Sequence, residues 1–555
     1  MRILLLCHSF NSLTQRLFVE LRERGEEVSV EFDISDAVLR EAVDLFEPDL
    51  VLAPFLKRAI PEDVLARAKC LIVHPGPPGD RGPSALDWAI LEGRENWGVT
   101  LLEAAPDLDA GPVWVTRAFP MRAASKSSHY RHEVTRGAVA CVIEALQKFR
   151  NGERAQPQPE LTPMRPVCPR ALRRIDWAAD DVDAVLRKIR SADGSPGAPG
   201  SIGGREYLLF NAEAAHGLPA AEPGTFLARR GGAVALAARD GAVWIGHLRE
   251  PAAGSLKLPA AHMLGDVFSA LPEKPSPLIR YEQDGDIGYL HFAFHNGAMS
   301  VADCRTLEAA IVSARREKAR ALVLTGGPDY WSNGLHLGVI EAAQSAAEES
   351  LQNIEAMNDC VRTLLAIDDR LVVAALRGNA GAGGVFLALA ADVVMMRDGV
   401  ILNPHYKDMG NLYGSEYWTY LLPRRVGSEK ARLITQNRLP MGAAQAARLG
   451  LADIILPEAP EEAEAVMRAR VQLIASVADF AERLAAKRLA REKDEATKPL
   501  EKYRSEELEK MQRNFFGFDP SYHVARHNFI RKVAKSRTPL HLALHRSLRP
   551  RRDIA

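Results

Sequence analysis

The sequence predicts an α/β protein of several domains: an open sheet covered by helices, a small β-barrel, a second α/β domain and a helical C-terminal extension. Three observations support this fold class. The chain has 555 residues, more than one hydrophobic core usually holds. Short apolar runs alternate with helical periodicity in two separate regions, a pattern typical of parallel sheets covered by helices. Between these regions, several short strand-like runs are broken by turn signals, which favours a barrel.

The composition indicates a soluble, cytoplasmic protein. Lys plus Arg equals Asp plus Glu at 71 each, so we expect no general attraction to nucleic acid or to an anionic membrane. The six cysteines form no CxxC pair, which suits reduced thiols better than disulfides or a metal site. The opening run "MRILLLCHSF" is too short for a signal peptide, and no apolar run approaches the ~20 residues that cross a bilayer.

The first domain is expected over residues 1–155. Its strand-like runs are 2–7, 27–32, 49–54, 70–75 and 98–104, with helical spacing over 12–24 and 129–149. Strands that alternate with helices predict a parallel sheet of the Rossmann-like type, with helices on both faces. A proline-rich segment, "NGERAQPQPELTPMRPVCPR", follows and has the composition of a linker.

A small barrel domain is expected over residues 170–272. A helix over 180–192 leads into the Gly/Pro-rich bend "DGSPGAPGSIGG". The strand-like runs that follow it are 205–212, 223–230, 233–240 and 241–250. Short strands with turn signals between them predict a barrel.

The alternation of strands and helices returns over residues 278–457, with strands expected at 287–294, 319–326 and 370–378. Residues 458–555 form the helical C-terminal extension. Its charged run, "ERLAAKRLAREKDEATKPLEKYRSEELEKMQR", predicts a solvated helix face.

The first candidate site centres on His74 and Asp109. His74 follows the expected strand "CLIV", and open parallel sheets place their chemistry at the carboxyl ends of strands. Asp109 lies in the turn "DLDAGP", which could bring a carboxylate to the imidazole. Such a pair supports general acid–base catalysis, although spacing alone also allows an ordinary packing pair.

The surrounding pattern, "HPGPPGDRGPSALDWAI" with "GVTLLEAAPDLDAGP", resembles the formyltetrahydrofolate-dependent formyltransferases, which include methionyl-tRNA formyltransferase. The resemblance continues into "IDWAADDVDAVLRKIRSADGSPGA", which is similar to the barrel domain of that family. It implies catalytic roles for His74 and Asp109. The family's catalytic Asn position, however, holds Ile72. His74 would then supply more of the oxyanion stabilisation, or the acceptor is a better nucleophile than an amine; a thiol fits the second option.

The same resemblance implies where the folate and the acceptor bind. The folate would lie against the loop "PFLKRAIPED", with Leu56, Lys57, Arg58 and Ile60 as lining residues. Simple loop packing is the alternative for each of them. The acceptor side would lie near Asn11, Ser12 and Arg16, which could meet a phosphate. Capping of the following helix is the alternative there.

The second candidate site lies in two loops that each follow a strand, "YWSNGLHLG" and "GNAGAGGVFLALAAD". Two backbone N–H groups from such loops can form a hole for a thioester oxygen; glycines packed tightly against a neighbouring strand are the alternative. The paired loops, with "GSEKARLITQNRLPMGAAQAARLGLAD" downstream, resemble the crotonase (enoyl-CoA hydratase/isomerase) superfamily. That resemblance implies Leu335 and Gly383 as the N–H donors and a CoA thioester as the ligand.

Both water-activating glutamates of that superfamily are replaced. Aligned on the glycines, Phe386 and Tyr406 take their positions, so hydration of a double bond is not expected. Glu416, in "LYGSEYWTY", stands where some relatives carry a catalytic acid; His405 and Tyr406 are also titratable. A buried Tyr and Glu can serve as a hydrogen-bond donor and a proton acceptor. The alternative for Glu416 is a carboxylate that faces a helix dipole.

Together the two halves resemble the HypX (also HoxX) family of hydrogenase maturation proteins, in which one chain joins a formyltransferase-like half to a crotonase-like half. The resemblance implies formyl transfer from 10-formyltetrahydrofolate to coenzyme A, then decarbonylation of formyl-CoA to CO and CoA. The CO would become a ligand of the NiFe-hydrogenase iron, with hydrogenase maturation factors as partners. Two alternatives stay open: a formyl-CoA hydrolase that releases formate, and a carrier that binds folate and CoA without chemistry.

Overall fold

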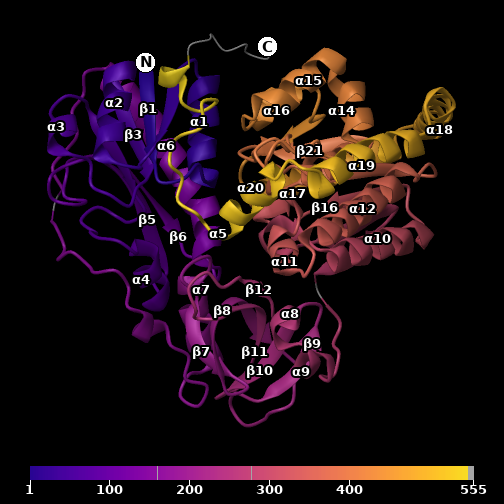
Figure 1. Ribbon diagram of the computed structural model, residues 1–555, viewed down its shortest axis with the longest axis horizontal. Coiled ribbons are helices and arrows are strands. Elements are labelled where there is room, and N and C mark those ends of the chain that lie inside the picture. The colour runs from indigo at the N-terminus through magenta and orange to yellow at the C-terminus, as the bar shows by residue number, and fades with distance from the viewer. Residues whose placement is uncertain (159, 277, 548–555) are drawn as a thin grey trace. The chain divides into compact units, whose positions relative to one another are not determined.

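The computed structural model describes residues 1–158, 160–276 and 278–547 (Figure 1). The described residues form two compact units. The first comprises Met1–Ser276 and the C-terminal segment that begins at Lys535, and the second runs from residue 278 to Ala534. Within the described residues, every helix is too short or too polar to cross a membrane.

The N-terminal sheet is mixed rather than fully parallel. Its order is β2 (Glu27–Phe32), β1 (Arg2–Cys7), β3 (Leu50–Phe55), β4 (Cys70–His74), β5 (Asn96–Glu103) and β6 (Val113–Pro120). The first four strands are parallel, as expected, but β5 is antiparallel to β4, and β6 is antiparallel to β5. The β5–β6 connection is too short for a parallel crossover, which needs a dozen or more residues. A hairpin is therefore the available geometry.

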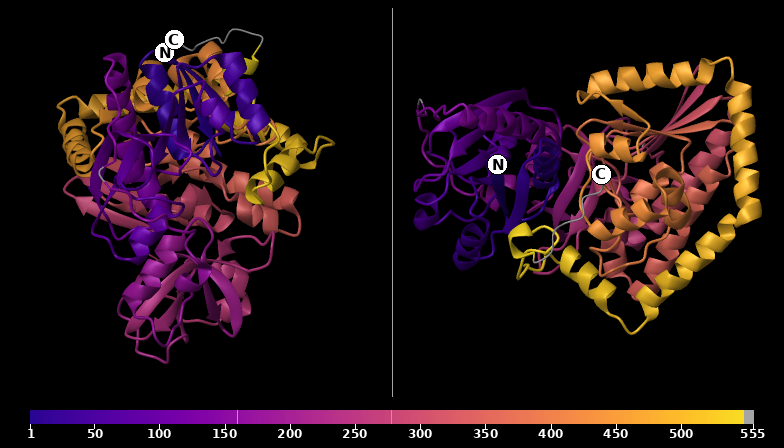
Figure 2. Two further views of the ribbon diagram at one scale, coloured as in Figure 1. Left: turned by 90° about the vertical axis from the view of Figure 1, so that its left-hand side faces the viewer. Right: turned by 90° about the horizontal axis from the view of Figure 1, so that it is seen from above.

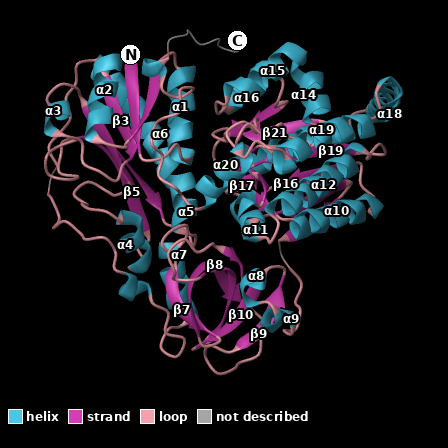
Figure 3. Ribbon diagram, in the orientation of Figure 1, coloured by secondary structure: helices cyan, strands magenta, loops and turns pink. Residues whose placement is uncertain are grey.

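Helices surround this sheet (Figure 3). They are α1 (Ser12–Glu23), α2 (Asp36–Phe46), α3 (Glu62–Leu65), α4 (Ala85–Leu91), α5 (Lys126–His129) and α6 (Thr135–Arg150), with a π-turn at Tyr130–Val134 between the last two. Local capping sets where the two helices nearest β1 begin. The Asn11 side chain accepts from Thr14 N–H at the start of α1, and Ser35 accepts from Val38 N–H at the start of α2.

The second domain of the first unit, where the sequence predicts a small barrel, is a curved antiparallel sheet (Figure 3). Its order is β7 (Ala198–Ile202), β8 (Arg205–Ala215), β11 (Gly241–Arg249), β10 (Ala233–Ala238) and β9 (Phe226–Arg230), with β12 (Leu258–Pro259) on β11. Helix α7 (Val182–Ala192) begins at the Asp181 cap and packs on β8; α8 (Ala260–Leu264) and α9 (Asp266–Ser269) follow the strands.

The central sheet of the second unit is parallel except for one edge hairpin. Its order is β13 (Ile279–Asp284), β14 (Ile287–Phe292), β16 (Ala321–Thr325), β19 (Leu371–Leu376), β21 (Val393–Arg397) and β23 (Ile454–Leu456). Only β13 is antiparallel to its neighbour. Two small parallel sheets follow the ends of these strands: β15 (Ala298–Met299) with β18 (Gly334–Leu335), and β17 (Tyr330–Ser332) with β20 (Asn379–Gly381) and β22 (Leu402–Asn403).

The helices of this unit pack around both kinds of sheet (Figure 1). They are α10 (Val301–Arg316), α11 (Leu337–Ala342), α12 (Ala346–Leu365), α13 (Gly383–Leu389), α14 (Trp418–Val426), α15 (Ser428–Asn437) and α16 (Ala443–Leu449). A capping box between Ser300 and Asp303 fixes the start of α10.

The C-terminal extension runs along the outside of the second unit (Figure 2). It comprises α17 (Pro460–Ser476), α18 (Phe480–Thr497), α19 (Leu500–Phe516) and α20 (Ser521–Ile530). The expected solvated face is present on α18, but the same expectation is wrong for one face of α19. Glu507, Met511 and Phe515 are buried there, because α19 packs against α12 and α14.

Candidate active sites

His74 is the last residue of β4, and two carboxylates face its two ring nitrogens. Its Nδ1 lies 3.5 Å from Asp109 Oδ1, and its Nε2 lies 2.9 Å from Asp80 Oδ2. The imidazole is buried. The structure thus brings His74 and Asp109 together, as the sequence predicts, and adds a closer contact with Asp80 that sequence reasoning missed. Asp80 lies within the motif "HPGPPGD", six residues after the histidine, but its spacing alone gives no reason to choose it.

Backbone geometry explains how this cluster forms. Gly76 lies so close to the His74–Asp80 pair that a Cβ there would overlap both His74 Nε2 and Asp80 Oδ2. Asp109 adopts a left-handed conformation with φ of 56°, and its Oδ2 accepts from Gly82 N–H at 3.0 Å. A non-glycine residue in this region carries strain that the surroundings must support. The histidine is therefore held by two carboxylates that the loops fix in place.

The residue two positions before His74 on β4 is Ile72, a half-buried apolar side chain. It presents no hydrogen-bond donor toward the end of the strand. An acyl oxygen bound beside His74 must therefore find its hydrogen-bond donors in groups other than the side chain of residue 72.

The two flanking loops place their predicted residues differently. Lys57 and Arg58 are exposed, whereas Ile60 is buried in the domain core and Leu56 packs against that core. Arg58 lies 2.5 Å from an oxygen of Asp36. Loop packing thus accounts for Ile60.

At the start of α1, Asn11 acts as the N-cap and Ser12 is the first helical residue. Arg16 is buried and forms an ion pair with Glu20 at 2.6 Å. Helix capping therefore accounts for Asn11.

The second site is built around Glu416, which is buried, with an exposed fraction of 1 %. The Tyr406 hydroxyl lies 2.6 Å from Glu416 Oε2 and 3.0 Å from the Ser415 carbonyl oxygen. The other carboxylate oxygen, Oε1, lies against Gly383, where a Cβ would overlap it. Glycine at 383 is therefore required by the close approach of this carboxylate to the first residue of α13.

The predicted donor loops also meet here. A Cβ on Gly334 would lie 3.4 Å from the Gly383 backbone nitrogen, so the Gly334–Leu335 strand and the start of α13 are adjacent. The first N–H groups of a helix have no partner inside the helix. Ala382, immediately before α13, has φ of 46° and ψ of −128°, a strained conformation for an alanine. Leu335, Gly383 and Glu416 thus line one small region.

The glycines of the Gly-rich loop serve two purposes. A Cβ on Gly384 would overlap the Ser332 carbonyl, and the Trp331 indole N–H donates to the Gly384 carbonyl at 2.9 Å. Tight packing against the neighbouring loop, the alternative raised by the sequence, therefore holds for Gly384. Gly383 differs because its neighbour is a titratable carboxylate.

Burial controls the protonation of this site. Burial, with a further contribution from the negative charge of Glu507, raises the pKa of Glu416 to about 7. Burial and the adjacent Glu416 charge raise the pKa of Tyr406 well above its usual value. Tyr406 therefore stays protonated at neutral pH, while Glu416 can exchange a proton.

His405 is also buried, and its Nδ1 has no hydrogen-bond partner among the described residues. Burial and the positive charge of Arg438 lower the pKa of His405 to about 4. The imidazole is thus neutral at physiological pH. Although His405 neighbours Tyr406 in the chain, it is Tyr406 that reaches the Glu416 carboxylate.

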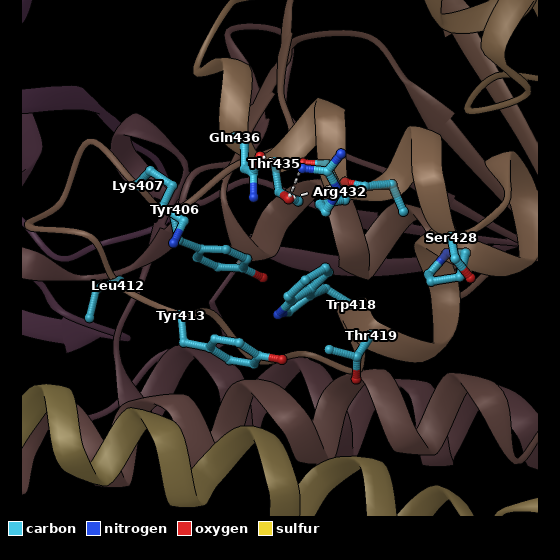
Figure 4. A pocket seen from close by; sticks show the side chains of 12 residues that line it. Tyr406, Lys407, Leu412, Tyr413, Trp418, Thr419, Ser428, Arg432, Thr435 and Gln436 are labelled. Carbon is cyan, nitrogen blue, oxygen red and sulfur yellow. Dashed lines mark hydrogen bonds between the residues drawn. The ribbon is translucent and has the colours of Figure 1, made fainter.

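A cavity of about 300 Å³ lies on one side of Tyr406 (Figure 4). Its wall includes the aromatic side chains of Tyr413 and Trp418 and the basic side chains of Lys407 and Arg432. Figure 4 shows the rings of Tyr406, Tyr413 and Trp418 near one another.

A curated relative matches almost the whole chain. The hydrogenase maturation factor HoxX of Bradyrhizobium diazoefficiens is 58% identical over 554 residues, which cover 98% of this chain and 97% of the relative. The chain belongs to the HypX/HoxX family. The crystal structure of HypX from Aquifex aeolicus in complex with tetrahydrofolic acid superposes with a TM-score of 0.97 at 48% identity, and the match covers 99% of this chain and 100% of that one.

Family models divide the HypX/HoxX chain into its two halves. Residues 23–146 match "Formyl transferase", residues 169–260 match "Formyl transferase, C-terminal domain", and residues 293–519 match "Enoyl-CoA hydratase/isomerase". A methionyl-tRNA formyltransferase of Aromatoleum aromaticum is 30% identical over 39% of this chain and 69% of that protein. These matches confirm the predicted fold class: a Rossmann-like formyltransferase domain and a crotonase-fold domain. The match to "Enoyl-CoA hydratase/isomerase" also includes α19.

Proposed function

We propose that this protein makes CO for hydrogenase maturation in two steps: formyl transfer from 10-formyltetrahydrofolate to CoA, then decarbonylation of formyl-CoA. Family membership and the two kinds of catalytic domain support the proposal. The observation that carries it is the buried Glu416–Tyr406 pair beside Gly383. The crotonase resemblance predicts Phe386 and Tyr406 at the positions of the two glutamates that activate water, so hydration is not expected.

In the first step, the CoA thiol attacks the formyl carbon of 10-formyltetrahydrofolate. His74 accepts the thiol proton at Nδ1, which lies 3.5 Å from Asp109 Oδ1, and passes it to the departing folate nitrogen. Asp80 at Nε2 and Asp109 stabilise the charged imidazole. A thiol acceptor also suits Ile72, since a thiolate attacks a carbonyl with less assistance than an amine. Tetrahydrofolate bound to the Aquifex HypX supports folate as the donor. In this proposal, Leu56, Lys57 and Arg58 line the folate site of this chain, and Asn11, Ser12 and Arg16 lie on the acceptor side.

In the second step, formyl-CoA is split into CO and CoA without any net oxidation. Leu335 and Gly383 N–H groups hold the formyl oxygen, and Glu416 removes the formyl proton. The C–H electron pair stays on carbon as its lone pair in CO, and the C–S electron pair leaves with sulfur. Tyr406 orients Glu416 and donates a proton to the thiolate, and Glu416 then restores the phenol. Excluding water matters here, because hydrolysis would give formate instead.

An isotope experiment separates decarbonylation from hydrolysis. The protein is incubated with CoA and 10-formyltetrahydrofolate that carries deuterium on the formyl carbon, and CO and formate are quantified. Decarbonylation breaks the C–H bond, so we expect CO, loss of the deuterium to solvent and a slower rate than with the protium substrate. Formate that retains its deuterium would establish a hydrolase. Binding of both substrates without either product would establish a carrier.

A further inference from the structure

The buried face of α19 in the C-terminal extension carries a carboxylate, Glu507. It lies in the middle of α19 within a strongly charged run, yet its side chain is completely buried. Burial of a carboxylate is costly unless hydrogen bonds compensate for it. Glu507 and Met511 are one helical turn apart, so they project from the same face of α19. The segment that they meet is the turn that carries Glu416.

Both oxygens of Glu507 accept hydrogen bonds from this turn. Oε2 accepts from Tyr417 N–H at 2.9 Å and lies 3.3 Å from Ser415 Oγ. Oε1 accepts from Thr419 N–H at 2.9 Å and from Thr419 Oγ1 at 2.5 Å. One side chain from the extension therefore binds the residues on both sides of Glu416.

The turn needs such support because of its conformation. Glu416 and Tyr417 both have φ of 58°, and two consecutive non-glycine residues in the left-handed region are strained. Asn358 of α12 also supports the turn, since its Oδ1 accepts from Glu416 N–H at 2.7 Å. Without these acceptors, the buried N–H groups would be unpaired and the turn would relax.

We propose that Glu507 is a positioning residue for Glu416: its carboxylate holds the strained turn and places a second negative charge close to the catalytic base. The proposal rests on the function proposed above, in which Glu416 removes the formyl proton. It assigns the C-terminal extension a direct part in the second site, because α19 alone supplies this carboxylate.

The charge of Glu507 matters because the four groups that donate to it are all uncharged. Among the described residues, Tyr406 and Cys304 are titratable groups that interact with Glu416, and Arg362 and Arg504 are charged groups that interact with Tyr417 of the turn. The two arginines act on Tyr417 and also form ion pairs with Glu501 and Asp359. Burial raises the pKa of Glu507 to about 7 as well. The negative charge of Glu507 in turn contributes to the raised pKa of Glu416.

Two substitutions change the charge and the geometry in different proportions. Glu507→Gln removes the negative charge, so Glu416 ionises more readily, and its amide NH2 also replaces one of the two accepting oxygens, so kcat should fall as well. The acid limb of the pH profile for CO release from formyl-CoA should then move down by about one pH unit. Glu507→Asp keeps the charge but shortens the reach to the turn, so kcat should fall about 10- to 100-fold while the acid limb stays in place. Glu506→Gln is the control: Glu506 is the neighbouring residue, only partly buried and paired with Lys498.

A spectroscopic titration keeps this inference distinct from the proposed function. Infrared difference spectra report protonated carboxyl groups without any turnover. The wild-type protein should show two buried carboxyl groups that titrate near neutral pH, and Glu507→Gln should leave one, shifted to lower pH. A wild type that releases no CO but titrates in this way would contradict the decarbonylase function alone. A Glu416 titration and a CO profile that are both unmoved in folded Glu507→Gln would overturn the role of Glu507.

Discussion

The ring of Phe386 is stacked on the ring of Tyr406, with centroids 5.5 Å apart and planes inclined by 13°. The crotonase resemblance predicts that both residues stand where hydratases carry glutamates. Phe386 is completely buried, so the stack presents an apolar ring beside Tyr406. The stack also holds in place the phenol of Tyr406, whose hydroxyl contacts Glu416.

Replacing the stacked ring of Phe386 with a smaller side chain should change which product forms, and not only the rate. Phe386→Leu opens space beside Tyr406 and should destabilise the fold by about 1–3 kcal/mol. Water that enters this space can attack formyl-CoA, so we expect the formate-to-CO ratio to rise about tenfold or more. Phe292→Leu is the control, since Phe292 is equally buried in the same core but contacts Trp331 instead. An unchanged product ratio in folded Phe386→Leu would argue against solvent exclusion by this ring.

Removing the base should stop only the second step. Glu416→Gln keeps the shape of the side chain and its contact with Tyr406 but cannot accept the formyl proton. We expect CO release to fall by at least about 10²-fold, while tetrahydrofolate and formyl-CoA still form at the wild-type rate. Both products can be followed by chromatography beside a CO assay. Equal loss of both steps would mean that the two reactions do not occupy separate sites.

The pH dependence of CO release follows from the raised pKa of Glu416, about 7. Only the ionised carboxylate accepts the proton, so the rate should rise about tenfold per pH unit below pH 7 and level off above it. The contribution of Glu416 to folding stability changes with pH in the opposite direction to the rate. A carboxyl group whose pKa is raised by folding favours the folded state at low pH, and this contribution is lost as the pH rises through about 7. A rate that is flat from pH 5 to 7 would exclude Glu416 as the base.

Much of the fold was predictable because its strands follow simple periodic patterns. The runs that become β1, β2, β4 and β14 are short, apolar and bounded by turn residues. Helix α2 and strand β6 are not among the predicted elements. The short connection over 104–112 explains why β6 is antiparallel to β5. The connection from β4 to β5 is long enough for a parallel crossover and contains α4, so its length does not explain the direction of β5. Pairing direction is a property of the chain path, and local sequence does not encode it.

The residues of the two candidate sites also divide into those that local motifs predict and those that depend on the path of the chain. His74 and Asp109, and Glu416 with Tyr406, were predicted from motifs, and the structure places each pair in contact. Asp80 and Glu507 were not predicted. Glu507 lies about 90 residues from the turn that it binds, in a charged run that resembles a solvated helix. Only the packing of α19 against α12 and α14 shows which one of its many carboxylates is buried.

Loss of the histidine should stop only the first step. His74→Ala removes the group that accepts the thiol proton, so transfer from 10-formyltetrahydrofolate to CoA should fall by about 10²- to 10⁴-fold. CO release from supplied formyl-CoA should continue unchanged. Asp80→Asn should have a smaller effect on transfer, since it weakens the support of the imidazole at Nε2 but leaves the ring in place. Unimpaired transfer in His74→Ala would refute the assignment.

Backbone and side-chain hydrogen bonds attach the C-terminal segment to the first unit. One buried carboxylate, Glu31, takes part in this attachment, and acid should weaken it. Glu31 of β2 accepts from His545 Nε2 at 2.9 Å and Arg546 Nη2 at 2.8 Å, and also from Thr538. Burial acts to raise the pKa of Glu31, but these hydrogen bonds outweigh it and hold the pKa below its usual value. The stabilisation is therefore present above about pH 4.5 and is lost as the pH falls further.

Glu31→Gln should detach this segment at neutral pH. Breaking one side of a buried ion pair costs about 3–5 kcal/mol, so the residues from Lys535 onward should become sensitive to limited proteolysis, and thermal unfolding should occur at a lower temperature. Glu41→Gln is the matched control. Glu41 is exposed and also pairs with Arg546, at 2.8 Å, and an exposed pair contributes only about 0–1 kcal/mol. Equal protease resistance in the two variants would show that apolar packing, such as that of Leu542, holds the segment without Glu31.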